Sequence, residues 1–248
     1  TGLGLVLPLV LALGWEAAAR TGVITTHLMP PPSTVAAHIV QLFATGEIWD
    51  HLVATLTRMA LGFGFGVAAG TLLGALVGYL PVAHRLLDPS VQALRNIPSI
   101  AWVPLFILWL GIFETSKITL IAVGVFFPVY MSLAQGFASV DRKLVEVGRV
   151  WRLSAFGMIR RILLPATLPT YVIGLRGGLG LGWMFVVAAE LMGASEGLGY
   201  LMMDGQMTGR PAAILASLVL FAILGKLSDF LLVTATRPLV AWQDGFRP

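Results

Sequence analysis

The sequence predicts an all-α membrane protein with about six transmembrane helices. Of its 248 residues, 57% are hydrophobic and only 11% are charged, whereas a soluble domain has about 25% charged residues. Several apolar stretches approach or exceed the roughly 20 residues that a helix needs to cross the hydrocarbon core. Because these stretches are continuous and do not alternate with polar residues, they favour helices over the strands of a β-barrel.

The composition also excludes several classes of function. The sequence has no cysteine and only four scattered histidines, so disulfides and the common metal sites are not expected. The chain has a net charge of +4. In a membrane protein such an excess of basic residues usually lies in cytoplasmic loops, so it does not indicate nucleic-acid binding. No Walker A motif occurs, and no nucleophile and base converge on an enzymatic site, so any ATP hydrolysis must come from another chain.

The first expected span is Leu3–Ala19, which we interpret as a retained helix, with a signal-like start as the alternative. The polar segment Arg20–Thr57 follows. Ser33 is expected to cap a short helix at Thr34–Phe43, and Glu47–Thr57 is expected to form another short helix. Residues 1–57 therefore form a first helix and an external segment, ahead of a core domain with five transmembrane helices at 58–237 and a cytoplasmic tail at 238–248.

The second expected span, Met59–Leu80, has a glycine at every fourth position, and a shorter stripe lies in the fifth span, about Leu168–Met192. At helical geometry such glycines form a bare stripe that lets two helix backbones approach closely. The spacing does not decide whether the partner helix belongs to the same chain. The packing glycines are Gly62, Gly66, Gly70, Gly74, Gly78, Gly174, Gly178 and Gly182.

The third apolar stretch runs from about Pro89 to Leu110 and is expected to be kinked, because Pro98 and Pro104 each remove an intrahelical hydrogen bond. The fourth span is Lys117–Phe137 and the sixth is Ala212–Thr234.

A basic loop at 141–165 separates the fourth and fifth spans. Asp141 is expected to cap a short helix through Trp151, and Ser154 a second one through Leu163 that ends at Leu164 and Pro165. Two short amphipathic helices held between two spans form a lever that tilts the spans when it is pushed. The alternative is an ordinary basic cytoplasmic loop.

The same loop carries a resemblance to a known family. Glu146, Ile162, Leu164 and Pro165 match the spacing of the coupling-loop motif of ABC-importer permeases, E-A-A-x3-G-x9-I-x-L-P. Valine and glycine at 147 and 148 replace the two alanines, and Arg152 replaces the motif glycine. If that glycine serves a left-handed turn, arginine there costs about 1 kcal/mol.

The resemblance extends over essentially the whole chain, including the segments 94–98, 104–112, 189–191, 197–200 and 225–229. The sequence is similar to the permease subfamily for nitrate, sulfonate, taurine and bicarbonate, and it resembles aliphatic-sulfonate permeases most. This resemblance implies a type I ABC-importer permease fold and a homodimer. It also implies a cytoplasmic ABC ATPase dimer, which would hold ATP and Mg, and a periplasmic or tethered substrate-binding protein. The chain itself is then a non-catalytic translocation subunit without a cofactor.

The resemblance implies that side chains of this loop dock the ATPase. They are Leu144, Glu146, Val147, Arg149, Trp151, Arg152, Ser154, Phe156, Ile162, Leu164 and Pro165. For Glu146 the alternative is an intrahelical pair with Arg142 or Arg149, worth a few tenths of a kcal/mol.

The candidates for the translocation path are Arg95, Asn96, Trp102, Arg176 and Glu190. An ionisable residue at membrane depth is a functional candidate by default, and the guanidinium fork suits a sulfonate. As alternatives, Arg95 snorkels to the interface, Arg176 pairs with a carboxylate or carbonyl, and Glu190 pairs with an arginine or seals the outer mouth. Trp102 has the alternative of an interfacial belt residue.

An ion-coupled secondary transporter is the alternative class, but it needs several intramembrane carboxylates. Only Glu190 and Asp229 qualify, and Asp229 is expected to form a local ion pair with Lys226.

The distribution of basic residues predicts the orientation in a bacterial plasma membrane. With the 141–165 loop in the cytoplasm, that side holds Arg85, Arg142, Lys143, Arg149, Arg152, Arg160, Arg161, Arg237 and Arg247. The other side holds Arg20, Arg58, Lys117 and Arg210. This excess satisfies the positive-inside rule and places both termini in the cytoplasm.

Overall fold

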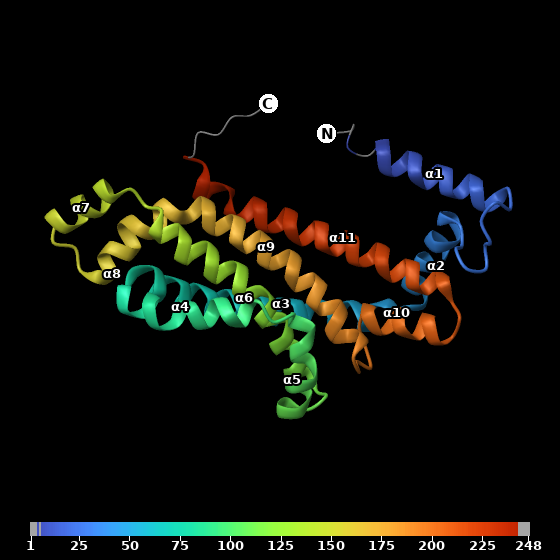
Figure 1. Cartoon of the computed structure of the whole chain (residues 1–248). Coiled ribbons are helices and arrows are strands. Elements are labelled where there is room, and N and C mark those ends of the chain that lie inside the picture. Colours follow the sequence, from blue (N-terminus) through green and yellow to red (C-terminus); the bar gives the residue numbers. More distant parts are fainter. Residues whose placement is uncertain (1–3, 5, 243–248) are drawn as a thin grey trace. The chain divides into compact units, whose positions relative to one another are not determined.

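The computed structural model describes residues 4 and 6–242, and these residues form helices, turns and connecting segments without a strand (Figure 1). The helices in chain order are α1 Val6–Arg20, α2 Pro32–Thr45, α3 Ile48–Tyr79, α4 Pro81–Arg95, η2 Ser99–Trp102, α5 Val103–Leu110, α6 Glu114–Ala138, α7 Arg142–Val150, α8 Ala155–Met158, η3 Ile159–Leu163, α9 Leu164–Leu191, α10 Leu198–Met207, α11 Pro211–Thr236 and η4 Arg237–Val240. The chain divides into two compact units, one made of 1–56 and 190–224 and the other of 57–189 and 225–248. The predicted boundaries after residues 57 and 237 stay a prediction, and Arg247 lies outside the described residues.

Within the described residues, four segments are long and apolar enough to cross a membrane: Ile48–Tyr79, Glu114–Ala138, Ala155–Leu191 and Pro211–Val240. They contain most of the second, fourth, fifth and sixth predicted spans. The first predicted span appears as α1, which has 15 residues. The third is divided into α4, a short 3₁₀ turn and the eight-residue α5, because prolines at 98 and 104 cannot continue a helical hydrogen-bond ladder.

Two details of the first unit differ from expectation. The segment Glu47–Thr57 does not form a separate helix, because α3 runs unbroken for 32 residues from Ile48. Ser33 does not cap α2, which begins at Pro32. Instead, the backbone N–H and the hydroxyl of Ser33 donate to the two carboxylate oxygens of Glu16, at 3.0 and 2.8 Å. A carboxylate therefore takes up donors at the start of α2, where a helix leaves N–H groups unpaired.

The core of the second unit is built around α6. Ile121, Val125, Val129, Tyr130 and Leu133 on this helix are fully buried. The glycine stripe of α3 and that of α9 both lie against α6, so the partner of each stripe is a helix of the same chain. The approach is close enough that added methyl groups would collide with α6, which is the contact that small residues permit between membrane helices.

The first unit has its own apolar core. Leu42, Ile48, Leu52, Leu198, Leu201 and Leu220 form one buried cluster. These residues come from α2, the beginning of α3, α10 and α11, so the cluster holds four helices together.

Candidate functional site

The loop between α6 and α9 begins with a well-capped helix, α7. The Asp141 side chain accepts a hydrogen bond from the Lys143 backbone N–H at 2.9 Å, which confirms the predicted cap. The inner face of the helix packs on a small core, where Val145 lies against Met158, Leu163 and neighbouring apolar residues. A side-chain cap and a buried face stabilise this short helix although it has only nine residues.

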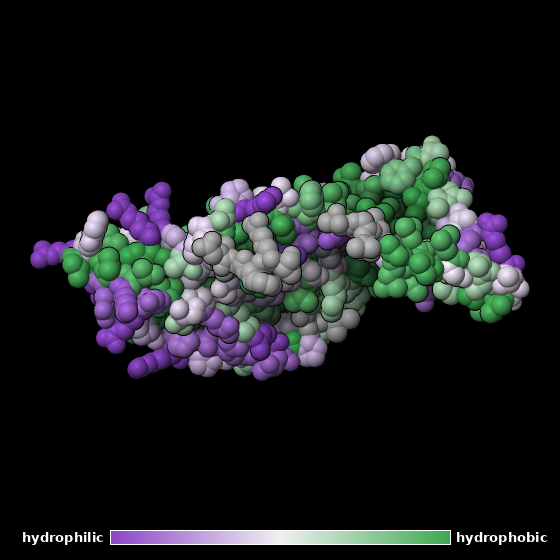
Figure 2. All heavy atoms as spheres, turned by 90° about the horizontal axis from the view of Figure 1, so that it is seen from above, coloured by the Kyte–Doolittle hydropathy of each residue, from purple (hydrophilic) through white to green (hydrophobic). Residues whose placement is uncertain are grey.

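The outer face of the loop exposes large apolar side chains. Val150, Trp151 and Phe156 are each more than 70% exposed. Figure 2 shows hydrophobic surface at α7 and α8, bordered by strongly hydrophilic residues. Leu144 and Val147, both from the predicted docking face, are also exposed. Exposed apolar groups with a polar border are typical of a surface that binds another protein.

The turn between the two short helices is left-handed. Arg152 has φ of 50° and is the one non-glycine residue with positive φ in the described part of the chain. Its N–H donates to the Arg149 carbonyl at 2.9 Å, and the Leu153 N–H donates to the Gly148 carbonyl at 3.1 Å. These two bonds form a Schellman motif, in which glycine is the usual residue at the left-handed position. The turn that the motif glycine serves is therefore kept, with an arginine in its place.

Gly148 brings α7 into close contact with the second half of the loop. A Cβ atom at this position would lie 2.6 Å from Ile162 Cδ1 and 2.8 Å from Met158 Cε. The missing side chain thus gives room to Ile162, one of the residues that match the coupling-loop motif.

The second half of the loop does not end at Leu164 and Pro165, contrary to expectation. Ser154 caps α8 as predicted, accepting from the Gly157 N–H at 3.2 Å. The helix then passes through a π-turn, Ile159–Leu163, and continues as α9. The Leu164 N–H donates to the carbonyl of Ile159, five residues earlier. This wider turn accommodates Pro165, which has no N–H for the normal ladder. The loop is consequently an extension of a 37-residue helix, Ala155–Leu191.

Glu146 pairs with Arg142, one of its two expected intrahelical partners. The Arg142 Nε and Glu146 Oε1 atoms are 2.9 Å apart, and both side chains are largely exposed. An exposed pair at this spacing contributes only a few tenths of a kcal/mol, so Glu146 stays accessible to another chain. Its docking role stays a prediction.

The path candidates of the second unit lie in different surroundings. Arg95 is exposed at the end of α4, with its guanidinium against the sulfur of Met131. Asn96 is the C-cap of α4. Trp102 stacks on Phe106, with ring centroids 6.0 Å apart, so it lies in an aromatic cluster.

Arg176 forms a two-pronged ion pair with Asp229, which links α9 to α11. Its Nε and Nη2 atoms donate to the two carboxylate oxygens at 2.8 and 3.1 Å. Asp229 thus takes Arg176 as its hydrogen-bonded partner, and Lys226, the expected partner, interacts with Asp229 through its charge. The two-pronged geometry of arginine explains the preference, because a guanidinium presents two parallel donors to a carboxylate.

Glu190, the fifth path candidate, belongs to the first unit and is buried there. Its carboxylate accepts from the Thr55 hydroxyl and from the Gly199 N–H, both at 2.8 Å. Thr55 accepts from the Leu198 N–H at 2.9 Å, and His51 accepts from the Gly197 N–H at 3.1 Å. Three side chains thus cap the beginning of α10.

The sequence analysis missed His51 and Thr55. Both lie in α3, an apolar helix, where a buried hydroxyl and imidazole require partners. That requirement is a signal of a polar site, but it does not identify the partner segment.

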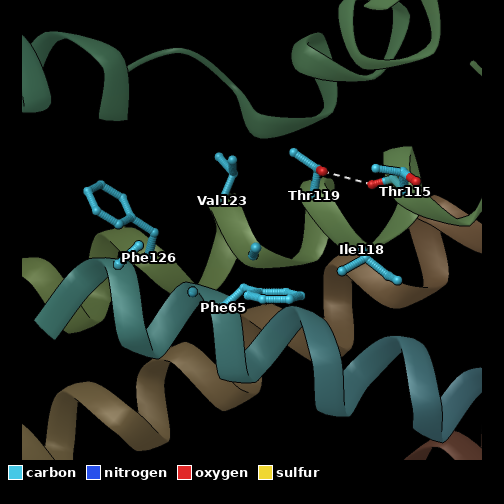
Figure 3. Close-up of a pocket in the computed structure, with 9 residues that line it drawn as sticks. Phe65, Thr115, Ile118, Thr119, Val123 and Phe126 are labelled. Atoms are coloured by element: carbon cyan, nitrogen blue, oxygen red, sulfur yellow. Dashed lines mark hydrogen bonds between the residues drawn. The ribbon is translucent and has the colours of Figure 1, made fainter. Parts of the chain in front are cut away.

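The second unit also has an apolar hollow, which does not suit anions. It has a volume of about 470 Å³ and lies between α3 and α6. Figure 3 shows Phe65, Ile118, Val123 and Phe126 around it. The Thr119 hydroxyl is hydrogen-bonded to the Thr115 carbonyl at 2.7 Å. None of the described residues that line the hollow is charged, so it suits acyl chains or apolar side chains.

Known proteins with similar sequences identify the family of this chain. A family model described as "Binding-protein-dependent transport system inner membrane component" matches residues 62–238. The chain is 40% identical over 243 residues to SsuC of Bacillus subtilis (strain 168), named as an aliphatic sulfonates transport permease; the match covers 98% of this chain and 88% of that protein. It is 34% identical to the taurine transport system permease protein TauC of Escherichia coli (strain K12), covering 94% and 87%.

A solved structure has a similar fold. A chain of the MetNI methionine ABC transporter, in an inward-facing conformation, matches with a TM-score of 0.61 and 23% identity. The match covers 77% of this chain and 94% of that chain. The all-helical chain therefore has the fold of a type I importer permease, as predicted.

Proposed function

Because the chain belongs to the family of binding-protein-dependent transport system inner membrane components, we propose that it is the permease of an ATP-driven importer for alkanesulfonates. Two copies form the pore, and a cytoplasmic ABC ATPase dimer with ATP and Mg docks on the loop at 141–165. A periplasmic or tethered binding protein delivers the substrate. Taurine, nitrate and bicarbonate are the alternative substrates. The similarity to the Bacillus subtilis sulfonate permease over 98% of the chain supports the substrate class.

The single observation that carries the docking role is the exposed apolar face of a stiff loop. Val150, Trp151 and Phe156 offer apolar surface that water does not stabilise, and aromatic residues are typical anchors at protein interfaces. Three features make the loop stiff: two side-chain caps, a Schellman turn and an uninterrupted helix into α9. A force on α8 is therefore transmitted to a transmembrane helix.

The basic residues of the loop support a cytoplasmic location. Arg149 precedes the segment Ala155–Leu191, and Arg160 and Arg161 lie in its first two turns. Basic residues near the ends of a span favour the cytoplasmic side. With this orientation both termini are cytoplasmic. The proposed anion contact is Arg95, whose guanidinium is exposed and has no carboxylate partner among the described residues. Arg176 is a weaker candidate, because Asp229 already occupies its donors.

Reconstitution with the cognate ATPase and binding protein tests the proposal. Uptake of a labelled alkanesulfonate should need ATP, and Val150→Asp or Trp151→Asp should abolish uptake while the variant permease remains folded. Val23→Asp is a matched control, since Val23 is 80% exposed and Val150 79% but Val23 lies between α1 and α2. Glu146→Arg probes the same surface by charge reversal.

Two results would contradict the proposal. Uptake that continues without the ATPase would indicate a secondary transporter. Equal uptake by Val150→Asp and Val23→Asp would show that the exposed face of the loop does not bind the ATPase. The substrate is identified separately, by measuring which small anions the partner binding protein retains.

A further inference from the structure

An apolar groove lies in the first unit between α1, α2 and the first part of α11. Its volume is about 400 Å³, within the range of roughly 300–1,000 Å³ that is usual for small-molecule pockets. Its walls include Ala12, Trp15, Pro32, Ile39, Leu218 and Val219. All the described lining residues are apolar, and the indole nitrogen of Trp15 is the one polar side-chain atom among them. The groove therefore suits a hydrocarbon chain.

The groove is open toward the lipid. Leu218 and Val219 are exposed and belong to the membrane-spanning segment Pro211–Val240. The surrounding medium at such a segment is the hydrocarbon of the bilayer. Hydrocarbon alone gives little preference for the groove, because lipid tails are as apolar as leucine. A ligand that binds specifically must therefore offer a polar contact as well.

Trp15 has the polar atom that such a contact needs. Its Nε1 atom is buried and has no hydrogen-bond partner among the described residues. The indole N–H can only donate, and a buried donor that is left unpaired lowers the stability of the protein. Because Trp15 lines the groove, a molecule bound there can supply the missing acceptor.

The groove adjoins polar groups at its Trp15 end. Glu16 follows Trp15, and its carboxylate accepts from the backbone N–H and the hydroxyl of Ser33, the residue after Pro32. Arg20 Nε lies 2.7 Å from Glu16 Oε1. Polar groups are thus followed by an indole and then by apolar walls, which is the order of head group, ester and tail along a phospholipid. Tryptophan is enriched at this level of membranes, since its ring is apolar and its N–H is polar.

We propose that the groove binds one acyl chain of a phospholipid and that Trp15 Nε1 donates a hydrogen bond to the ester carbonyl of that chain. The head group lies beside Glu16 and Ser33, and the tail follows the groove along α2 and α11. The bound lipid thereby fills the space that α1, α2 and α11 leave between them. This assignment goes beyond the proposed transport function and does not depend on which substrate is imported.

The experiment compares dioleoyl phosphatidylglycerol with its diether analogue, which has the same head group but CH₂ groups in place of the two ester carbonyls. Equilibrium binding of each lipid is measured by native mass spectrometry of the full-length permease. The wild type should bind the ester lipid about 2- to 12-fold more tightly, which is the range that one neutral hydrogen bond gives. Trp15→Phe keeps an aromatic ring without a donor and should bind both lipids equally. Ala36→Phe places a phenyl ring in the groove and should weaken both.

Trp102→Phe is the matched control. Trp102 Nε1 is also buried and unpaired among the described residues, but Trp102 belongs to the second unit and stacks on Phe106. This variant should keep the preference for the ester lipid, and all variants should melt close to the wild type.

Loss of the ester preference in Trp15→Phe alone supports the assignment. Equal binding of the two lipids by the wild type, or an undiminished preference in Trp15→Phe, overturns it. Loss of the preference in Trp102→Phe instead would place the lipid in the second unit and overturns the assignment too. A failure of the proposed function looks different: the complete transporter would then import no alkanesulfonate with ATP, whichever lipid is bound.

Discussion

Gly148 lies directly against Ile162: a Cβ atom on Gly148 would be 2.6 Å from Ile162 Cδ1. We expect Gly148→Ala to push α7 away from the π-turn and to lower the stability of the loop by about 1 kcal/mol. This cost is at the low end for overpacking, because the colliding atoms are the ends of flexible side chains. The rate of ATP-driven uptake should fall clearly, while the melting temperature of the permease should change only slightly. Gly180→Ala is the control, since nothing lies within 4 Å of a Cβ there.

The double variant Gly148→Ala with Ile162→Val removes the colliding Cδ1 atom. It should recover part of the lost uptake. If uptake by Gly148→Ala equals that by Gly180→Ala, the contact does not matter for coupling.

The left-handed conformation of Arg152 gives a second prediction. A non-glycine residue pays roughly 1–2 kcal/mol for this conformation, so Arg152→Gly should stabilise the permease by about 1 kcal/mol. Arg152→Ala is the control, because alanine keeps the backbone cost but lacks the charge. Thermal unfolding in detergent measures both. If Arg152→Ala raised the stability as much as Arg152→Gly, the effect would come from loss of the guanidinium and not from the left-handed turn.

Much of this architecture follows from local chemistry and is predictable from the sequence. The caps at Asp141 and Ser154 each depend on residues within three positions. The four spanning segments follow from hydropathy. The continuity of the helix through Pro165 does not follow from the usual rule that a proline ends a helix, because a π-turn at Ile159–Leu163 accommodates the proline.

Other features depend on residues far apart in the chain. Glu190 and Thr55 are separated by 135 residues, and Arg176 and Asp229 by 53. A sequence pattern shows that each of these polar groups needs a partner, but the fold decides which one it receives.

The buried hydroxyl of Thr55 gives a third prediction. It donates to Glu190 and accepts from the Leu198 N–H. Thr55→Val should destabilise the first unit by about 1–3 kcal/mol, because two buried polar groups lose this partner. Thr55→Ser keeps the hydroxyl and should cost less. Hydrogen exchange at the Leu198 amide should speed up in the valine variant alone, and equal rates in both variants would contradict the capping role.

The glycine stripe of α3 gives a fourth prediction. A Cβ atom on Gly70 would lie 2.9 Å from the Phe126 backbone oxygen, which cannot move aside easily, whereas a Cβ on Gly64 meets nothing within 4 Å. Gly70→Ala should therefore cost about 1–3 kcal/mol through overpacking, and Gly64→Ala should be nearly neutral. Melting of the two purified variants provides the comparison, and similar melting temperatures would show that α3 and α6 separate at little cost.

The ion pair of Arg176 with Asp229 gives a fifth prediction, which also decides between two roles for Arg176. Arg176→Gln or Asp229→Asn alone leaves one charge in a membrane-spanning helix without its partner, so the yield of folded protein should fall. The double variant is neutral and keeps amide groups that can hydrogen-bond. We expect it to restore both the folded yield and the uptake, because the pair joins α9 to α11. Restored yield with uptake still absent would instead place Arg176 on the path of the anion.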